Sequence, residues 1–185
     1  MTQSKPRLKF TVREYMTTLE DKRYQLLEGE MILTPSPTTT HQRILGNLFR
    51  LLDAAFVAPG RGQVALSPLD VVLSDYDVAQ PDILFISNER ADIITEANIQ
   101  GAPDLVVEIL SPSTGAYDRG YKQVLYGRHG VREYWIVDPD AETVDVLVEG
   151  EDGLIPLGSY GNTGELNTPL LEGLTLDLDE LFHRN

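Results

Sequence analysis

Two acidic side chains in this sequence stand inside apolar segments whose pattern predicts buried strands. Glu108 lies within residues 103–110, a nearly continuous run of Val, Leu and Ile, and Asp82 opens the similar run 81–86. A carboxylate buried there without a partner is costly, so we expect a shifted pKa or a paired cation. Two carboxylates held in this way suit a hard cation such as Mg²⁺ or Mn²⁺, which prefers oxygen ligands.

A lysine on the next predicted helix could complete that site. Asp118, Lys122 and Tyr126 are spaced by four, so they share one face of a helix expected over residues 115–128. One interpretation is an ordinary surface ion pair between Asp118 and Lys122. The other directs Lys122 toward Glu108, where its ammonium would orient a water or stabilise charge on a phosphate. The residues alone leave both interpretations open.

Other polar residues have weaker claims to a role. His41 begins a helix predicted over residues 40–57, where the helix N-terminus favours anions, so we consider a phosphate contact alongside a purely structural role. Glu28 and Glu30 flank Gly29 in a predicted hairpin, and position alone does not assign them to the site. Asp104 follows a proline and is expected to be a solvated acid at the start of a strand.

Composition narrows the class of protein. The 185 residues fit a single domain, 1–185, and the absence of cysteine excludes disulfides and thiolate metal sites. With 15 Lys and Arg against 29 Asp and Glu, the net charge is −14, which argues against a general DNA-coating protein but permits a local basic groove. No long apolar span and no apolar N-terminal signal are present, so we expect a cytoplasmic location.

The order of predicted elements indicates an α/β fold of the mixed α+β kind, with a mixed central sheet flanked by helices. Extra β elements are expected at both ends. The predicted helices cover residues 12–19, 40–57, 115–128 and 177–182. The predicted strands and hairpins cover residues 24–33, 62–66, 69–73, 81–86, 103–110, 133–138 and 143–157.

Walker, dinucleotide-binding, Gly-x-Ser-x-Gly and His-Glu-x-x-His motifs are absent, so kinase, hydride-transfer and serine-hydrolase chemistry lack their usual parts.

About two thirds of the chain resembles a known family. The matching text covers residues 24–32, 35–41, 77–86 and 103–139, and its most specific part is VEILSPST at 107–114 followed by EYWIVDP at 133–139. In order, spacing and residue type it resembles the PD-(D/E)XK nuclease superfamily, which has a restriction-endonuclease-like fold, and within it the Uma-type restriction-endonuclease branch.

The resemblance implies a set of site residues. Asp82 and Glu108 would bind a divalent cation, Mg²⁺ with Mn²⁺ as substitute, and the main-chain carbonyl of Ile109 would be a third ligand. The superfamily's usual lysine would stand at Leu110, and in this branch Lys122 would supply the amine instead. The implied reaction is metal-dependent hydrolysis of phosphodiester bonds in nucleic acid, with DNA the expected substrate.

The same resemblance leaves further expectations and one departure. A homodimer is expected from the symmetry of cutting two strands. Gln25 stands where relatives usually carry Glu, which predicts weaker metal binding here.

Two rival functions remain open. A nuclease-fold binding or regulatory module is favoured by the net charge of −14 but has no evident need for Asp82, Glu108 and Lys122 together. A sugar hydrolase with paired carboxylates would need neither the lysine nor a metal. Loss of activity with a chelator or in Lys122→Ala would argue against the sugar hydrolase, and binding of a divalent ion without turnover would indicate the binding module.

Overall fold

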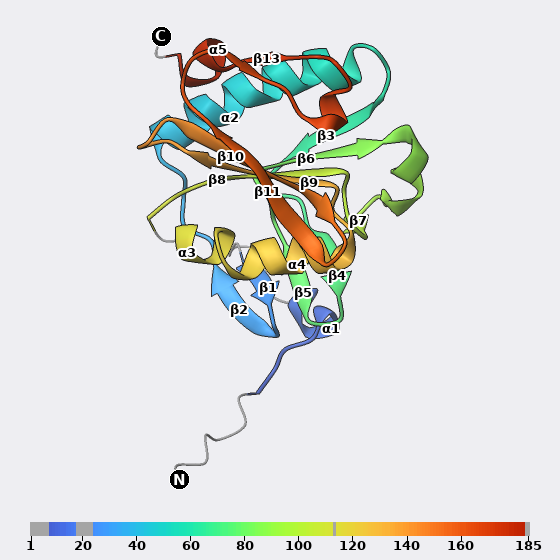
Figure 1. Ribbon diagram of the computed structural model, residues 1–185. Helices are drawn as coiled ribbons and strands as arrows, with labels where there is room; N and C mark the ends of the chain where they lie inside the picture. Colours follow the sequence, from blue (N-terminus) through green and yellow to red (C-terminus); the bar gives the residue numbers. More distant parts are fainter. Residues whose placement is uncertain (1–7, 18–23, 113, 184–185) are drawn as a thin grey trace.

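Two sheets and the helices around them form the layers of the molecule (Figure 1), as seen in a computed structural model that describes residues 8–17, 24–112 and 114–183. The central sheet has the strand order β11 (Gly153–Tyr160), β10 (Thr143–Gly150), β9 (Glu133–Asp138), β8 (Leu105–Ile109), β6 (Ile83–Ser87) and β3 (Gly62–Leu66). The second sheet has the order β2 (Glu30–Leu33), β1 (Tyr24–Leu27), β5 (Asp77–Ala79), β4 (Val71–Ser74) and β7 (Ile99–Gln100). A small ribbon pairs β12 (Glu165–Leu166) with β13 (Leu176–Asp177).

The helices lie on both sides of the central sheet. They are α1 (Val12–Tyr15), α2 (Thr39–Leu52), α3 (Gly115–Asp118), α4 (Tyr121–His129) and α5 (Leu178–Phe182), and a π-helical turn, Asp53–Val57, continues α2. Figure 1 shows α2 and α5 on one face of the sheet, with α4 and the second sheet on the other. Within the described residues, no helix is long and apolar enough to cross a membrane.

The side chains of β8 alternate between the two faces of the sheet, and this alternation decides which face Glu108 is on. Val107 and Ile109 pack in the cluster that contains Leu48 of α2, whereas Val106 packs with Tyr126 of α4 on the opposite face. Because successive side chains on a strand point to opposite faces, Glu108 shares the face of Val106 and is directed toward α4. The strand therefore presents one carboxylate to the helix that follows it in the chain.

The predicted fold class is confirmed. The central sheet is mixed, with β8 parallel to β9 and antiparallel to β6, and helices flank it. The strand predicted at 133–138 is β9, and the predicted N-terminal hairpin is β1 with β2. Between β6 and β8 the chain forms a 3₁₀ helix, Asn88–Ile93, and β7. Part of the helix predicted over 12–19 lies outside the described residues.

The prediction of one continuous helix over residues 115–128 was wrong, because the structure has two helices there. The segment 115–128 forms α3 and α4, separated at Gly120, which has φ −120° and ψ −92°. Those torsions lie outside the helical region, and glycine is the residue that adopts such conformations at least cost. A Cβ at Gly120 would meet the carbonyl oxygen of Ala116 at 2.9 Å, so the local backbone also leaves little room for a side chain.

The expectation of a solvated Asp104 was also wrong. Its side chain is fully buried, and its Oδ2 accepts a hydrogen bond from the backbone N–H of Ser87 at 2.7 Å. Its Oδ1 lies 3.0 Å from Nη1 of Arg132 and 3.4 Å from Nε of Arg90. Asp104 thus ties the beginning of β8 to the end of β6 and holds the two strands that carry the acids of interest.

We predict that Asp104→Ala lowers the free energy of unfolding by about 2 kcal/mol, because the buried N–H of Ser87 loses its acceptor. Denaturant unfolding of both proteins measures the difference. Glu89→Ala is the control: its carboxylate lies 3.9 Å from Arg132 but is 82% exposed, so its loss should have little effect. Equal stabilities of the two variants would contradict the structural role given to Asp104.

Candidate active site

The register of β6 against β8 brings the two predicted carboxylates together. These strands are antiparallel with Ile83 opposite Val107, so Asp82, which directly precedes β6, faces Glu108 near the end of β8. The Oδ2 atom of Asp82 accepts a hydrogen bond from the backbone N–H of Ile109 at 2.7 Å. Both acids therefore lie where β6 begins and β8 ends, in the interior of the central sheet.

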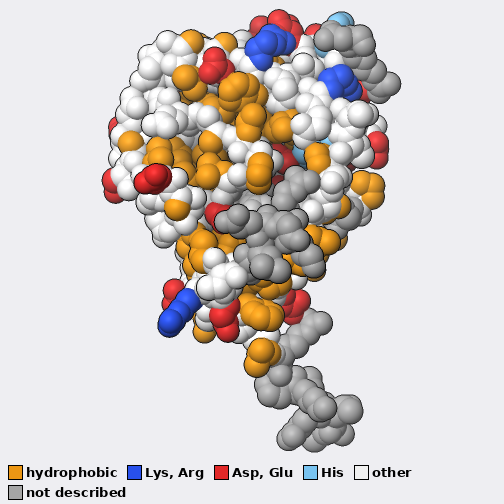
Figure 2. Space-filling model, turned by 180° about the vertical axis from the view of Figure 1, so that it is seen from behind, with side chains coloured by type: hydrophobic (Ala, Val, Ile, Leu, Met, Phe, Trp, Pro, Cys, Tyr) orange, Lys and Arg blue, Asp and Glu red, His pale blue; other side chains and the backbone are white. Residues whose placement is uncertain are grey.

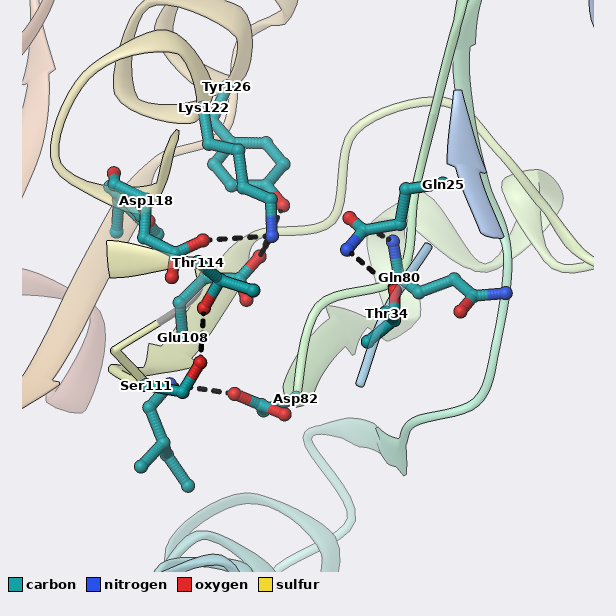
Figure 3. A network of polar contacts seen from close by, with 12 residues as sticks. Gln25, Thr34, Gln80, Asp82, Glu108, Ser111, Thr114, Asp118, Lys122 and Tyr126 are labelled. Atoms are coloured by element: carbon teal, nitrogen blue, oxygen red, sulfur yellow. Dashed lines mark hydrogen bonds and ion pairs between the residues drawn. The ribbon is translucent and has the colours of Figure 1, made fainter. Parts of the chain in front are cut away.

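Lys122 completes a buried polar network with Glu108 (Figure 3). Its Nζ lies 2.8 Å from Oε1 of Glu108 and 3.0 Å from Oδ1 of Asp118. The hydroxyl of Tyr126 donates to the same Oε1 at 2.7 Å. All four side chains are buried, so both expected partners of Lys122 are present, but the idea that Asp118 and Lys122 form a surface ion pair is wrong.

Burial and excess negative charge govern the protonation of this network. Burial raises the pKa of Glu108 to about 8; the Lys122 ammonium opposes this shift, and the charges of Asp118 and Asp82 add to it. For Lys122, burial acts to lower the pKa, but the carboxylates of Glu108 and Asp118 outweigh it and raise that pKa above its ordinary value. Lys122 is therefore a permanent cation in the network.

The buried charges favour one more cation. If Asp82, Glu108 and Asp118 are ionised, their three negative charges and the single positive charge of Lys122 leave a net formal charge of −2. Within the described residues, Oδ2 of Asp118 is buried with no hydrogen-bond partner. A divalent cation would neutralise this excess, and the donor set is oxygen, which Mg²⁺ prefers.

The possible ligands are few. Within the described ranges, no group of three or more His, Cys, Asp or Glu side chains is arranged to hold a metal. The contacts described above use Oδ2 of Asp82 and Oε1 of Glu108, so Oδ1 and Oε2 are the atoms through which a cation would be bound. Mg²⁺ is commonly held by one or two carboxylates and keeps several waters. A site with a pair of acids therefore suits Mg²⁺ better than Zn²⁺ or Ca²⁺, which take more protein ligands.

His41 lies against Asp82. Its Nε2 is 3.2 Å from Oδ2 of Asp82, and the tautomer with hydrogen on Nε2 donates to that oxygen. Its backbone N–H is bound by the side chain of Thr38, the N-cap of α2. His41 is thus placed to orient Asp82, a contact that the sequence did not indicate.

The network opens into a cavity of about 990 Å³. Asp82, Glu108, Ile109, Lys122 and His41 all line it, whereas Glu28 and Glu30 do not. The remaining lining comes mainly from the segments before and within the first turn of α2, around Ser67, and at the ends of β8 and β9: Thr34, Pro35, Ser36, Pro37, Thr38, Thr40, Gln42, Leu45, Leu66, Ser67, Pro68, Gln80, Leu110, Ser111, Pro112, Thr114, Gly115, Asp138, Pro139 and Asp140. All the predicted site residues therefore face one space.

Gln25 also lines this cavity, and its side chain is already engaged. Its Oε1 accepts a hydrogen bond from the backbone N–H of Gln80 at 3.1 Å, and its Nε2 donates to Oγ1 of Thr34 at 3.3 Å. Figure 3 shows this second group of contacts beside the Glu108 network. The neutral amide at this position adds no charge to the site, and the weaker metal binding expected from the sequence stays a prediction.

Comparisons with known proteins agree with this architecture. The family model described as "Putative restriction endonuclease" (Uma2) matches residues 12–179. An uncharacterized protein of Synechocystis sp., slr1290, is 26% identical over 183 residues, which cover 97% of this chain and 94% of that protein. The crystal structure of a putative nuclease belonging to DUF820 from Anabaena variabilis aligns with a TM-score of 0.77 and 22% identity, covering 94% of this chain and 97% of that one.

The fold is thus that of a nuclease-like α/β protein, as the resemblance in the sequence implied. The chain belongs to the Uma2 family, because the family model spans most of its length. Family and fold together support a nuclease-like function.

We predict that Tyr126→Phe destabilises the protein by about 1 kcal/mol, because Glu108 loses one buried donor while the ring still fills its place. Thermal or denaturant unfolding measures this loss. Tyr117→Phe, which removes a hydroxyl from a tyrosine 40% exposed on α3, should leave stability unchanged. If Tyr126→Phe is as stable as the wild type, the hydroxyl does not contribute to holding Glu108.

Proposed function

We propose that this protein is a metal-dependent endonuclease that hydrolyses phosphodiester bonds of nucleic acid, with DNA as the first substrate to test. The observation that carries the proposal is the convergence of Asp82, Glu108 and Lys122 on one cavity, with the ammonium 2.8 Å from Glu108. Family membership supports the same reaction class.

The carboxylates of Asp82 and Glu108 would hold Mg²⁺, or Mn²⁺ in its place, together with the main-chain carbonyl of Ile109. When bound, the cation would supply charge neutralisation at the phosphate and an acidified water. His41 and the N–H of Ile109 fix the orientation of Asp82 through its Oδ2, and Tyr126 and Lys122 fix Glu108 through its Oε1. Each acid is thus oriented by two donors on one oxygen and keeps the other for the cation.

Lys122 has a separate role in the proposal. An ammonium carries three N–H donors, and the carboxylates of Glu108 and Asp118 account for two of them. The third can donate to a water or to a phosphate oxygen in the cavity, and the raised pKa keeps it charged at neutral pH. That charge would stabilise the negative charge that develops in the transition state.

The substrate contact proposed for His41 is compatible with its place. His41 lies in the first turn of α2, whose N-terminus carries no acidic residue and lines the cavity through Thr38, Thr40 and Gln42. A phosphate beside Asp82 would meet the positive end of the helix dipole there. A homodimer and a cytoplasmic location stay predictions.

One observation favours a second function, a nuclease-fold binding module. Among the described residues that line the cavity, Lys122 is the only Lys or Arg. The whole chain has a net charge of −14. A nucleic acid would therefore approach without much electrostatic attraction. Such a module would bind a divalent cation without turnover.

We expect purified wild-type protein to cleave plasmid or single-stranded DNA in Mg²⁺ or Mn²⁺, and to stop when EDTA is added. Asp82→Asn and Glu108→Gln should each lose at least about 100-fold in rate, because each removes a charged oxygen ligand. Gel assays of initial rate measure the loss.

Glu151→Gln, prepared identically, controls for contaminating nucleases and for loss of an acid as such. Residue 151 is exposed in the turn between β10 and β11, and it does not line the cavity, so this variant should cleave like the wild type. Equal cleavage by Glu108→Gln and the wild type would identify the activity as a contaminant. Cation binding without cleavage of any nucleic acid would favour the binding module.

A further inference from the structure

We infer that the site accepts a single nucleic-acid strand, such as an unpaired stretch or a strand end, and not a continuous duplex. The inference rests on the proposed function and names the form of its substrate. It follows from the depth, the size and the lining of the cavity.

Depth is the first argument. The side chains of Glu108 and Lys122 are 5% and 2% exposed, and that of Asp82 is 16% exposed. A phosphate can reach these groups only by entering the cavity. In a continuous duplex each phosphate is held between paired and stacked neighbours, and moving it into a recess requires deforming the duplex, which costs energy. A flexible single strand can bring one phosphate into the cavity without that cost.

Size is the second argument. A volume of about 990 Å³ is in the range of small-molecule sites, which corresponds to a few nucleotides at most. A duplex is wider than its major groove, which alone is about 12 Å across. Two paired strands would therefore not fit inside a cavity of this volume. A flexible single strand can pass its backbone through a space of this size.

The lining is the third argument. Five prolines, residues 35, 37, 68, 112 and 139, and three leucines, residues 45, 66 and 110, contribute to the cavity. These apolar side chains can bury the faces of unpaired bases by hydrophobic contact, whereas a duplex hides those faces in its own stack. The unpaired bases of a single strand could therefore pack against this lining, whereas the paired bases of a duplex could not.

Charge points the same way. Among the described lining residues, Asp138 and Asp140 add negative charge, and Lys122 is the only Lys or Arg. On the face shown in Figure 2, hydrophobic side chains gather over a wide area while Lys and Arg side chains are sparse. Duplex binding depends on cations that neutralise many closely spaced phosphates, and the described lining of the cavity and this face offer few of them.

Binding to the full-length chain in EDTA tests the inference without any need for cleavage. Fluorescence anisotropy compares a labelled oligonucleotide with the blunt duplex of the same sequence at one salt concentration. We expect the single strand to bind at least about tenfold more tightly, because its unpaired bases can bury apolar surface against the prolines and leucines of the lining. Equal or tighter binding of the duplex, or no binding of either, would overturn the inference.

A matched pair of variants tests the location. Thr40 and Thr39 are neighbours in the first turn of α2 and both are exposed, but only Thr40 lines the cavity. Thr40→Glu places a carboxylate in the path of the strand and should weaken single-strand binding by about fivefold. Thr39→Glu should bind like the wild type, and equal effects of the two variants would show that the strand binds elsewhere.

Cleavage separates this inference from the proposed function. With Mg²⁺ or Mn²⁺, a duplex that contains an unpaired gap should be cut in the gap and spared elsewhere. Preferential cutting of the blunt duplex would overturn the single-strand inference and leave the nuclease in place. Single-strand binding without cutting of any substrate would refute the nuclease and leave the inference in place.

Discussion

The buried ion pair between Lys122 and Glu108 is the interaction on which the rest of the site depends. Removing two charges from water costs several kcal/mol per ion, and this cost is offset only when good geometry and further hydrogen bonds are present. Here Asp118 and Tyr126 supply those further contacts, and both come from the two short helices that follow β8. The pair thus fixes how α3 and α4 lie against the strand.

The pair is also poorly explained by stability alone. A set of well-packed apolar residues in the same place would be as stable or more so, so an ion pair at this depth is weak support for a purely structural role. Burial is the main cause of the raised pKa of Glu108; the charges of Asp118 and Asp82 add to the shift and the Lys122 ammonium opposes it. A divalent cation bound beside Glu108 would favour its ionised form. Membership of the Uma2 family supports a nuclease-like function for the chain.

Much of this arrangement could be predicted from the sequence because it depends on local patterns. The apolar run around Glu108 indicated a buried strand with a costly carboxylate, and the spacing of Asp118, Lys122 and Tyr126 indicated one common face. Strand order then placed Asp82 beside Glu108, and the register of β6 with β8 agrees with that. The hydroxyl of Tyr126 is a second donor to Glu108 that the sequence analysis did not predict, although its spacing of four residues from Lys122 places it on the same helix face.

Other features depend on partners far apart in the chain. The burial of Asp104 rests on Arg90 and Arg132, and nothing near Asp104 in the sequence indicates either contact. The second sheet joins strands from residue 24 to residue 100, so no single segment predicts it. The break at Gly120 interrupts a pattern that continues on both sides. In each case the structure depends on tertiary contacts or on one backbone conformation, and the periodicity of apolar residues in the sequence does not predict either.

Isothermal titration of Mn²⁺ into metal-free protein measures the proposed cation site without reference to any substrate. We predict that one Mn²⁺ binds per chain in the wild type, with binding weakened at least about tenfold in Glu108→Gln and unchanged in Glu151→Gln. Identical binding by Glu108→Gln and the wild type, or no binding by the wild type, would contradict it.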